Sequence, residues 1–246
     1  MIKTSASLLA CDLADISGEL SRCKAANVDW IHFDVMDGAF VDQITYGSPV
    51  LKCVRRATDM FLDVHLMVND PASQIKFFAE AGADLIIIET MGDPYEMKAA
   101  VLGAREACDL PILATMMADV NGRLLTGGTV ETMAVLLDGL GVTALGLNCG
   151  LGGPEMLPLL RRIRRVTERP LLCSPNAGLP RMEGGRTVFP AGPEAFAQAQ
   201  RELAQAGAWL LGGCCGTTPE HIRAMVAACR EVTPAPVPPV TETWIS

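Results

Sequence analysis

The stretch DLIIIETMGDPYEMKAAVLGAREAC, residues 84–108, contains in one piece the unit from which the chain is built. Its first six residues form a short apolar run of the length of a buried strand. Asp93 and Pro94 then supply a capping residue and a first-turn proline, which is how helices commonly begin. The residues that follow have the apolar spacing of a helix. The stretch therefore predicts a strand, a loop and a helix.

The same succession of an apolar run and an amphipathic segment recurs along the chain. Eight strands are predicted, at residues 4–10, 29–35, 60–67, 84–89, 110–116, 143–148, 169–174 and 208–213. Eight strand–helix units in 246 residues predict an α/β fold with a single (β/α)8 TIM barrel. The alternative is a doubly wound open sheet, but no glycine-rich nucleotide loop follows the first predicted strand. We expect the barrel over residues 1–232, followed by a proline-rich tail or linker, TPAPVPPVTETWIS, over residues 233–246.

Composition excludes several kinds of partner. The net charge of −8 argues against nucleic acid and anionic membranes. The densest basic cluster, RRIRR at 161–165, is predicted to be the solvated face of a helix. No apolar run approaches the roughly 18 residues of a membrane span. Nine cysteines and no apolar leader segment predict a reducing, cytoplasmic location, where thiols bind metals or react.

Three cysteines lie where predicted strands end, in GLNCGLGGPEM (146–156) and GGCCGTTPEHIRAM (212–225). Cys149 ends the sixth strand, and Cys214 and Cys215 follow the eighth, with glycines that permit a sharp bend. In a barrel these strand ends are only one strand apart. Three thiolates would leave one tetrahedral position open, which is typical of a catalytic zinc. The alternatives are inert buried cysteines or a vicinal disulfide, and the surrounding glycines and the reducing location favour zinc.

A second polar group lies in HFDVMDG (32–38) and DVHLM (63–67). His32 and Asp34 are two residues apart on one strand and therefore face the same side. If that side is the barrel interior, they converge with His65 on the next strand. Two histidines and a carboxylate predict a second divalent metal site. The alternative is a pair of hydrogen-bonded core histidines.

Residues 4 to about 88 resemble the first half of a ribulose-phosphate 3-epimerase, in the stretches SASLLACD, DWIHFDVMDGAFV, ITYG and LDVHLMVNDP. That family is a TIM barrel that uses a divalent metal to move a proton of a ketopentose phosphate. The resemblance implies that His32, Asp34 and His65 are metal ligands, that Asp34 is also an acid/base, and that Ser7 lines the pocket. The family's second aspartate, on the seventh strand, is missing from RPLLCSPNAG. We therefore expect no meaningful epimerase activity.

Residues 84 to the end resemble the second half of a homocysteine S-methyltransferase domain, found alone or as a module of cobalamin-dependent methionine synthase. The motifs are LIIIETMGDPYEMKAA, LPILATM, GRLLTGG, GLNCGLGGP, SPNAGLP and GGCCGTTPEHI. The resemblance implies that homocysteine supplies the fourth zinc ligand and that its thiolate attacks a methyl group. It also implies that Glu89 and Asn176 contact the amino acid or orient the site, and that Asn148 supports the cysteine loop. The zinc ligands it implies are Cys149, Cys214 and Cys215.

The two resemblances meet in ADLIIIET, residues 83–90. We interpret the chain as a chimera with an epimerase-like half over 1–88 and a methyltransferase-like half over 89–232. The substrate-gripping motifs of the methyltransferase family's first two strands are absent, so reduced substrate affinity is expected. The favoured function is a zinc-dependent homocysteine S-methyltransferase, and the alternatives are a ribulose-phosphate 3-epimerase-type isomerase and a non-catalytic metal-binding scaffold. The methyl donor stays open among methylcobalamin on a partner module, S-methylmethionine, S-adenosylmethionine and betaine.

Overall fold

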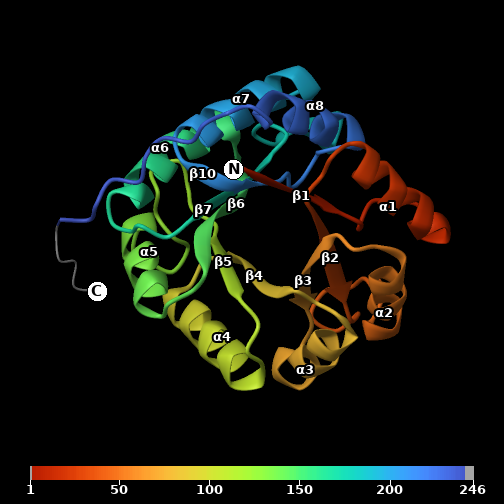
Figure 1. Cartoon of the computed structure of the whole chain (residues 1–246). Helices are drawn as coiled ribbons and strands as arrows, with labels where there is room; N and C mark the ends of the chain where they lie inside the picture. The colour runs from red at the N-terminus through yellow and green to blue at the C-terminus, as the bar shows by residue number, and fades with distance from the viewer. Residues whose placement is uncertain (1, 242–246) are drawn as a thin grey trace.

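The eight apolar segments form eight parallel strands that close into a barrel (Figure 1). The computed structural model describes residues 2–241. The barrel strands are β1 (Lys3–Ser7), β2 (Trp30–Met36), β3 (Phe61–Met67), β4 (Leu85–Met91), β5 (Ile112–Met116), β6 (Ala144–Gly152), β7 (Leu171–Asn176) and β10 (Ala208–Leu211). Each pairs with the next in parallel, and β10 pairs with β1 to complete the ring. The predicted (β/α)8 fold is confirmed.

Eight α-helices cover the outside of the barrel (Figure 1). They are α1 (Ile16–Ala25), α2 (Ser48–Ala57), α3 (Pro71–Ala81), α4 (Pro94–Ala107), α5 (Val130–Gly139), α6 (Gly153–Arg164), α7 (Pro193–Gln205) and α8 (Pro219–Cys229), with a short 3-10 helix η1 (Leu13–Asp15) before α1. The predicted start of α4 is confirmed, because the Asp93 carboxylate accepts hydrogen bonds from the N–H groups of Tyr95 and Glu96, with Pro94 in the first turn. Within the described residues, no helix is long and apolar enough to cross a membrane.

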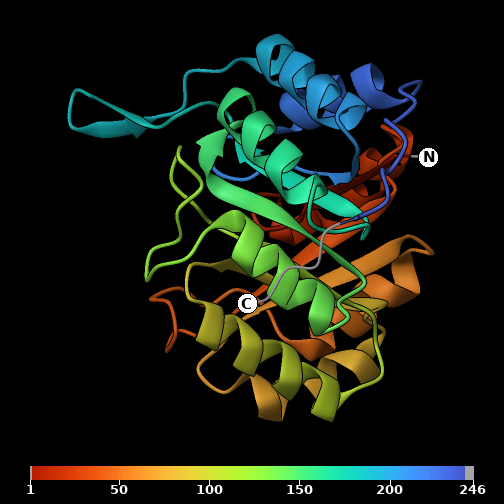
Figure 2. The ribbon, with the colours of Figure 1, turned by 90° about the vertical axis from the view of Figure 1, so that its left-hand side faces the viewer.

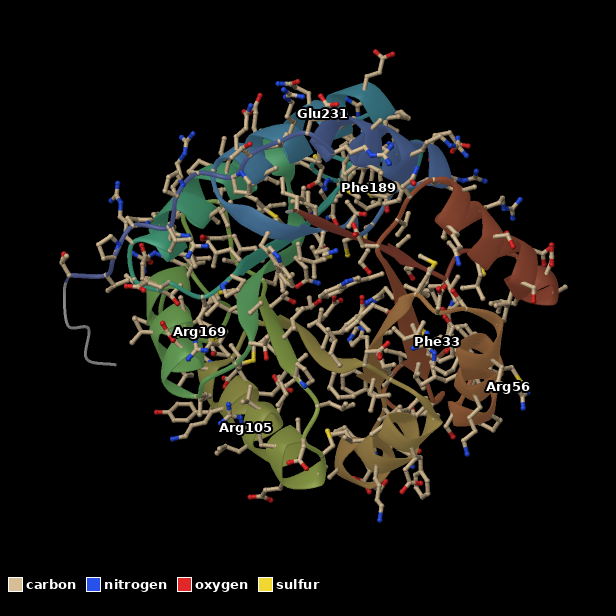
Figure 3. The ribbon with its side chains drawn as sticks, viewed as in Figure 1. Phe33, Arg56, Arg105, Arg169, Phe189 and Glu231 are labelled. Carbon is tan, nitrogen blue, oxygen red and sulfur yellow. The ribbon has the colours of Figure 1, made fainter. Side chains whose placement is uncertain are left out.

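Apolar side chains close the bottom of the barrel and leave polar ones at its mouth. The inner apolar cluster comprises Trp30, Leu85, Ile87, Leu113, Ala144, Leu172 and Leu210, from the early part of the strands. Residues two further along share the same inward side, so Trp30 is followed by His32 and Asp34, and Ile87 by Glu89. Alternate residues face the helices, as Phe33 of β2 does in its contact with Tyr46 (Figure 3). The strand period therefore places the polar residues at the carboxyl ends of the strands.

A hairpin that the sequence analysis did not predict lies between β7 and α7. It pairs β8 (Arg181–Glu183) with β9 (Arg186–Val188) and projects away from the barrel (Figure 2). Gly184 and Gly185 form its turn with φ of +56° and +78°. Two consecutive glycines with positive φ are typical of a two-residue hairpin turn, so the Gly-Gly pair was the available signal.

The cluster RRIRR is not wholly a solvated helix face. Arg164 is 8% exposed, and its guanidinium donates hydrogen bonds to the carbonyls of Thr167 and Arg169 at 3.1 and 2.9 Å. Those carbonyls lie in the turn between α6 and β7, where an arginine can reach several acceptors at once. The prediction was wrong for this arginine because a side chain that satisfies buried carbonyls has the same sequence signal as a surface charge.

Residues 233–241 contain neither helix nor strand and run along the outside of the barrel (Figure 1). The Ala235 N–H donates to the Gln205 carbonyl at 3.1 Å, and the Val240 N–H donates to the Glu168 carboxylate at 3.0 Å. This part of the predicted tail is therefore in contact with the barrel. Residues 242–246 of the predicted tail lie outside the described residues.

Candidate functional site

Three thiols meet at the mouth of the barrel. The Sγ of Cys215 lies 3.8 Å from that of Cys149 and 3.9 Å from that of Cys214, and all three sulfurs lie within 4.8 Å of one another. Thiolates bound about 2.3 Å from one tetrahedral zinc ion would be about 3.8 Å apart. The spacing of the three sulfurs thus fits shared coordination of a single ion.

Two bends in the backbone bring these thiols together. β6 and β10 lie on either side of β7, so their carboxyl ends are close. Cys149 has φ of +55°, a left-handed conformation that is rare for a residue with a Cβ and that is often found at functional sites. Gly216 has φ of +79°, and a Cβ there would lie 2.4 Å from the Cβ of Phe189. The glycine after the cysteine pair is therefore required by both conformation and space.

Hydrogen bonds to β7 hold the cysteine pair in position. The Cys214 N–H donates to the Pro175 carbonyl at 3.0 Å. The Cys215 N–H donates to the side-chain Oδ1 of Asn176 at 3.1 Å, and the Cys215 carbonyl accepts from the Ala177 N–H at 2.9 Å. The predicted site residue Asn176 is buried and orients Cys215 through its backbone.

The three thiols share their protons unequally. Hydrogen bonds from Cys214 and Cys215 hold the pKa of the Cys149 thiol well below its ordinary value. The same contact with Cys149 raises the pKa values of Cys214 and Cys215. The arrangement therefore favours the thiolate form at Cys149, the form that binds a metal ion.

The predicted histidine cluster is also brought together, around the carboxylate of Asp34. Asp34 Oδ1 lies 3.0 Å from His32 Nε2 and 3.0 Å from His65 Nδ1. The other ring nitrogen of His32 bonds to Asp63, whose second oxygen accepts from the Ser5 hydroxyl at 2.7 Å. The strand period accounts for the arrangement, because these side chains come from neighbouring strands and face inward.

Burial and the neighbouring charges shift the pKa values of His32 and Asp34 in opposite directions, and the charges have the larger effect. Burial disfavours protonated His32, but the carboxylates of Asp34 and Asp63 outweigh it and hold its pKa well above the ordinary value. Burial also disfavours ionised Asp34, but His32 and His65 hold the pKa of that carboxyl well below its ordinary value. Ser7, predicted to line the substrate pocket, donates its hydroxyl to Asp34 Oδ2 at 2.6 Å.

Glu89 joins the histidine cluster as well as the region beside Cys149. Ligand atoms of His32, His65 and Glu89 lie within 4.8 Å of one another, with Glu89 Oε2 3.7 Å from His65 Nδ1. The buried Asn148 amide approaches the same Glu89 oxygen at 3.4 Å, and Asn148 directly precedes Cys149. Glu89 was predicted to lie at the cysteine site only. Its contact with His65 was not predicted, because Asp34 was the carboxylate expected beside the two histidines.

Asn148, which is predicted to support the cysteine loop, also forms hydrogen bonds to β4 and β5. Its Oδ1 accepts from the Thr115 hydroxyl at 2.7 Å and from the Thr90 N–H at 3.0 Å. Its Nδ2 donates to the Thr90 hydroxyl at 2.7 Å. Thr90 has φ of +62° at an irregularity near the end of β4, so this amide holds a strained part of the strand beside Glu89. Asn148 thus links the end of β4 to the strand that carries Cys149.

The fold and these side chains define a parallel (β/α)8 barrel that gathers three thiols at the carboxyl ends of its strands, where barrel enzymes have their active sites. The family model described as homocysteine S-methyltransferase matches residues 59–229, which is more than half of the sequence. The chain belongs to this family. The model of the ribulose-phosphate 3-epimerase family matches residues 3–112. The two matches overlap over residues 59–112, which include the predicted junction at 83–90.

The chain is 38% identical over 159 residues to the methionine synthase of Mycobacterium tuberculosis (strain ATCC 25618 / H37Rv), which covers 62% of the chain and 13% of that protein. It is 36% identical over 165 residues to the methionine synthase of Mycobacterium leprae (strain TN), and this match covers 65% of the chain and 14% of that protein. The chain thus spans only about a seventh of the length of these relatives.

Solved structures share the barrel at low sequence identity. The metallated form of the homocysteine methyltransferase MmuM from Escherichia coli has a TM-score of 0.65 at 18% identity, covering 92% of this chain and 95% of that one. The dihydropteroate synthase from Xanthomonas albilineans with 7,8-dihydropteroate has a TM-score of 0.61 at 15% identity, covering 93% and 91%. At these identities the likeness supports the fold.

Proposed function

We propose that the chain is a zinc-dependent homocysteine S-methyltransferase-type barrel, in which Cys149, Cys214 and Cys215 hold the zinc and the substrate sulfur occupies the fourth position. The observation that carries the proposal is the spacing of 3.8 and 3.9 Å between the sulfurs, which suits one tetrahedral ion. Zinc bound there would keep a substrate thiol ionised near neutral pH, where a free thiol is mostly protonated.

The chain's own residues would then position the thiol for attack on a methyl group. Asn176 holds Cys215 through its backbone, and Asn148 holds the end of β4 that carries Glu89. The Glu89 carboxylate would pair with the ammonium group of the amino acid. The Mycobacterium relatives are methionine synthases, which supports homocysteine as the acceptor and a separate methyl-donor module, carrying methylcobalamin or another donor, as the partner.

Substrate binding is expected to be weaker than in a complete member of the family. The end of β1 is engaged inside the histidine cluster, since the Ser7 hydroxyl is bonded to Asp34. The first family-matched residue is 59, so β1 and β2 lie outside the homocysteine S-methyltransferase match. We propose that the chain joins an epimerase-like half to a methyltransferase-like half, and that zinc binding persists while substrate affinity is reduced. The cytoplasmic location stays a prediction.

Binding of the substrate thiol can be tested on protein loaded with cobalt(II) in place of zinc. We expect homocysteine to intensify the thiolate-to-cobalt charge-transfer bands, because a fourth sulfur joins three. Homoserine, which has a hydroxyl in place of the thiol, is the matched control and should leave the bands unchanged. A cobalt spectrum with three-sulfur intensity that does not respond to saturating homocysteine would instead support the non-catalytic scaffold.

We also propose that His32, Asp34 and His65 form the second divalent metal site that the sequence predicts. Donor atoms at about 2.1 Å from one octahedral ion lie about 3.0 Å apart at neighbouring positions, and Asp34 Oδ1 is 3.0 Å from a nitrogen of each histidine. Asp63 bonds to His32 Nδ1 and thereby directs the Nε2 lone pair towards the cluster, as carboxylates behind metal-bound histidines do.

Metal stoichiometry separates the two sites. We expect wild-type protein saturated with zinc to hold two equivalents and His65→Ala to hold one. Cys214→Ser should retain the histidine-cluster equivalent. One equivalent in wild type, or two in His65→Ala, would refute the second site. β7 contains no carboxylate to act as a partner acid/base, so we propose no epimerase turnover even with this metal bound.

A further inference from the structure

We propose that His221, in the first turn of α8, is a positioning residue for Cys215 and acts through the base of the β8–β9 hairpin. The inference rests on the proposed zinc site. It concerns a side chain that touches neither the thiols nor the histidine cluster. Residues 177–191, which leave β7, form the hairpin and return to α7, are called here the strap.

The ring of His221 is fixed in orientation and tautomer. It is 7% exposed and lies edge-on to Phe196, with ring centroids 5.5 Å apart. Its Nδ1 accepts a hydrogen bond from the Thr218 N–H at 3.2 Å. The ring proton is therefore on Nε2, which donates to the Ala191 carbonyl at 2.8 Å. The start of α8 thus bonds directly to the returning end of the strap.

Two further hydrogen bonds continue from Ala191 to the zinc loop. The Ala191 N–H donates to the Ala177 carbonyl at 2.9 Å, which joins the two ends of the strap. The Ala177 N–H donates to the Cys215 carbonyl at 2.9 Å. Since the Cys215 N–H is already bound to Asn176, both polar groups of the Cys215 backbone depend on residues 176 and 177. His221 is therefore connected to the Cys215 backbone by three successive hydrogen bonds, through Ala191 and Ala177.

The base of the strap packs against the loop that carries Cys215 and Gly216, so a movement of the strap would displace that loop. Phe189 lies against Gly216, where even a methyl group on the glycine would be 2.4 Å from the phenylalanine Cβ. The hairpin projects from the barrel (Figure 2), and Met182 in its first strand is 67% exposed. The strap is therefore held at its base, and a shift there would reach Gly216 and the adjacent Cys215. Groups behind metal ligands commonly change metal affinity 10- to 100-fold when they are replaced.

Two substitutions at His221 separate the hydrogen bond from the packing. His221→Phe keeps an aromatic ring beside Phe196 but removes the donor to Ala191. His221→Gln offers an amide N–H in place of Nε2–H. Thr218→Ala is the comparison variant: it removes the hydroxyl that lies 2.9 Å from His221 Nδ1 and weakens the start of α8, but it keeps the Nε2 donor to Ala191. The readouts are zinc affinity by chelator competition and amide hydrogen exchange of Ala177 and Ala191 in metal-free protein.

We expect His221→Phe to bind zinc about 10-fold more weakly and to exchange both amides faster than wild type. His221→Gln should recover most of the affinity and protection, and Thr218→Ala should bind zinc within about twofold of wild type while melting at a lower temperature. Wild-type affinity and protection in His221→Phe would overturn the inference, as would equal losses in all three variants. If His221→Phe does not fold, His221→Gln decides the question. Full zinc affinity in His221→Gln supports the inference. Folded His221→Gln whose zinc affinity is as low as that of Cys215→Ser overturns it.

The exchange experiment keeps this inference separate from the zinc proposal. If wild-type protein binds no zinc, the proposed function fails, while faster exchange of Ala177 and Ala191 in His221→Phe would still show that His221 holds the strap. If wild type binds zinc and His221→Phe binds it equally well, only the positioning role fails.

Discussion

Cys215→Ser is expected to weaken zinc binding by about 100-fold. Apparent zinc binding energies in small four-ligand sites are roughly 10–16 kcal/mol, so one ligand corresponds to about 3 kcal/mol. Cys215 lies 3.8 and 3.9 Å from the other two sulfurs and is central to the cluster. A serine hydroxyl cannot replace a thiolate there, because it stays protonated and is a poor zinc ligand. Competition with a chelator of known affinity measures the change in freshly reduced protein.

Cys53→Ser is the matched control, since Cys53 is exposed on α2 and belongs to no thiol cluster. It should leave zinc affinity unchanged. Cys149→Ser and Cys214→Ser should resemble Cys215→Ser, since all three sulfurs would share the ion. Unaltered zinc affinity in any of these three variants would show that the corresponding cysteine is not a ligand.

Asp34→Asn is expected to lower the free energy of unfolding of metal-free protein by about 3 kcal/mol near pH 5, because it removes the buried charged partner of two partly buried histidines. The lowered pKa of Asp34 means that its contribution is present above its unfolded value of 3.8 and is lost as pH falls through the folded value. The raised pKa of His32 means that its contribution is present below 6.5 and is lost as pH rises through the folded value. The stabilisation is therefore largest between about pH 4 and pH 6.5.

Urea denaturation from pH 3 to pH 9, in the presence of a chelator, measures this profile. The difference between wild type and Asp34→Asn should shrink on both sides of that window. Asp42→Asn alters an exposed carboxylate on the loop after β2 and should follow the wild-type profile. A wild-type advantage that stays constant across the whole range would contradict the charge pairing, and would assign the effect of Asp34 to packing alone.

The alternation of apolar runs and amphipathic segments was enough to predict the barrel, because eight buried parallel strands leave a clear pattern of length and hydropathy. The thiol cluster could be predicted for the same reason. Cys149, Cys214 and Cys215 follow strands whose carboxyl ends must meet once the ring closes. The distances between the three sulfurs also depend on the left-handed φ of Cys149, which the sequence pattern does not predict.

Long-range contacts were the part that the sequence could not supply. Glu89 lies close to both His65 and Asn148, and these contacts depend on the directions of the side chains in the closed barrel. The link from His221 to Cys215 passes through backbone groups of Ala191 and Ala177, whose side chains carry no chemical signal. Arg164 was misplaced because its carbonyl acceptors, in the turn between α6 and β7, give no signal in the sequence.

X-ray absorption at the zinc edge of His65→Ala protein, which lacks the proposed second site, tests whether the three cysteines hold the zinc. We expect three sulfur neighbours at about 2.3 Å and one lighter neighbour, with the lighter neighbour replaced by a fourth sulfur when homocysteine is added. A zinc ion surrounded mainly by nitrogen and oxygen, or one with fewer than three sulfur neighbours, would contradict it.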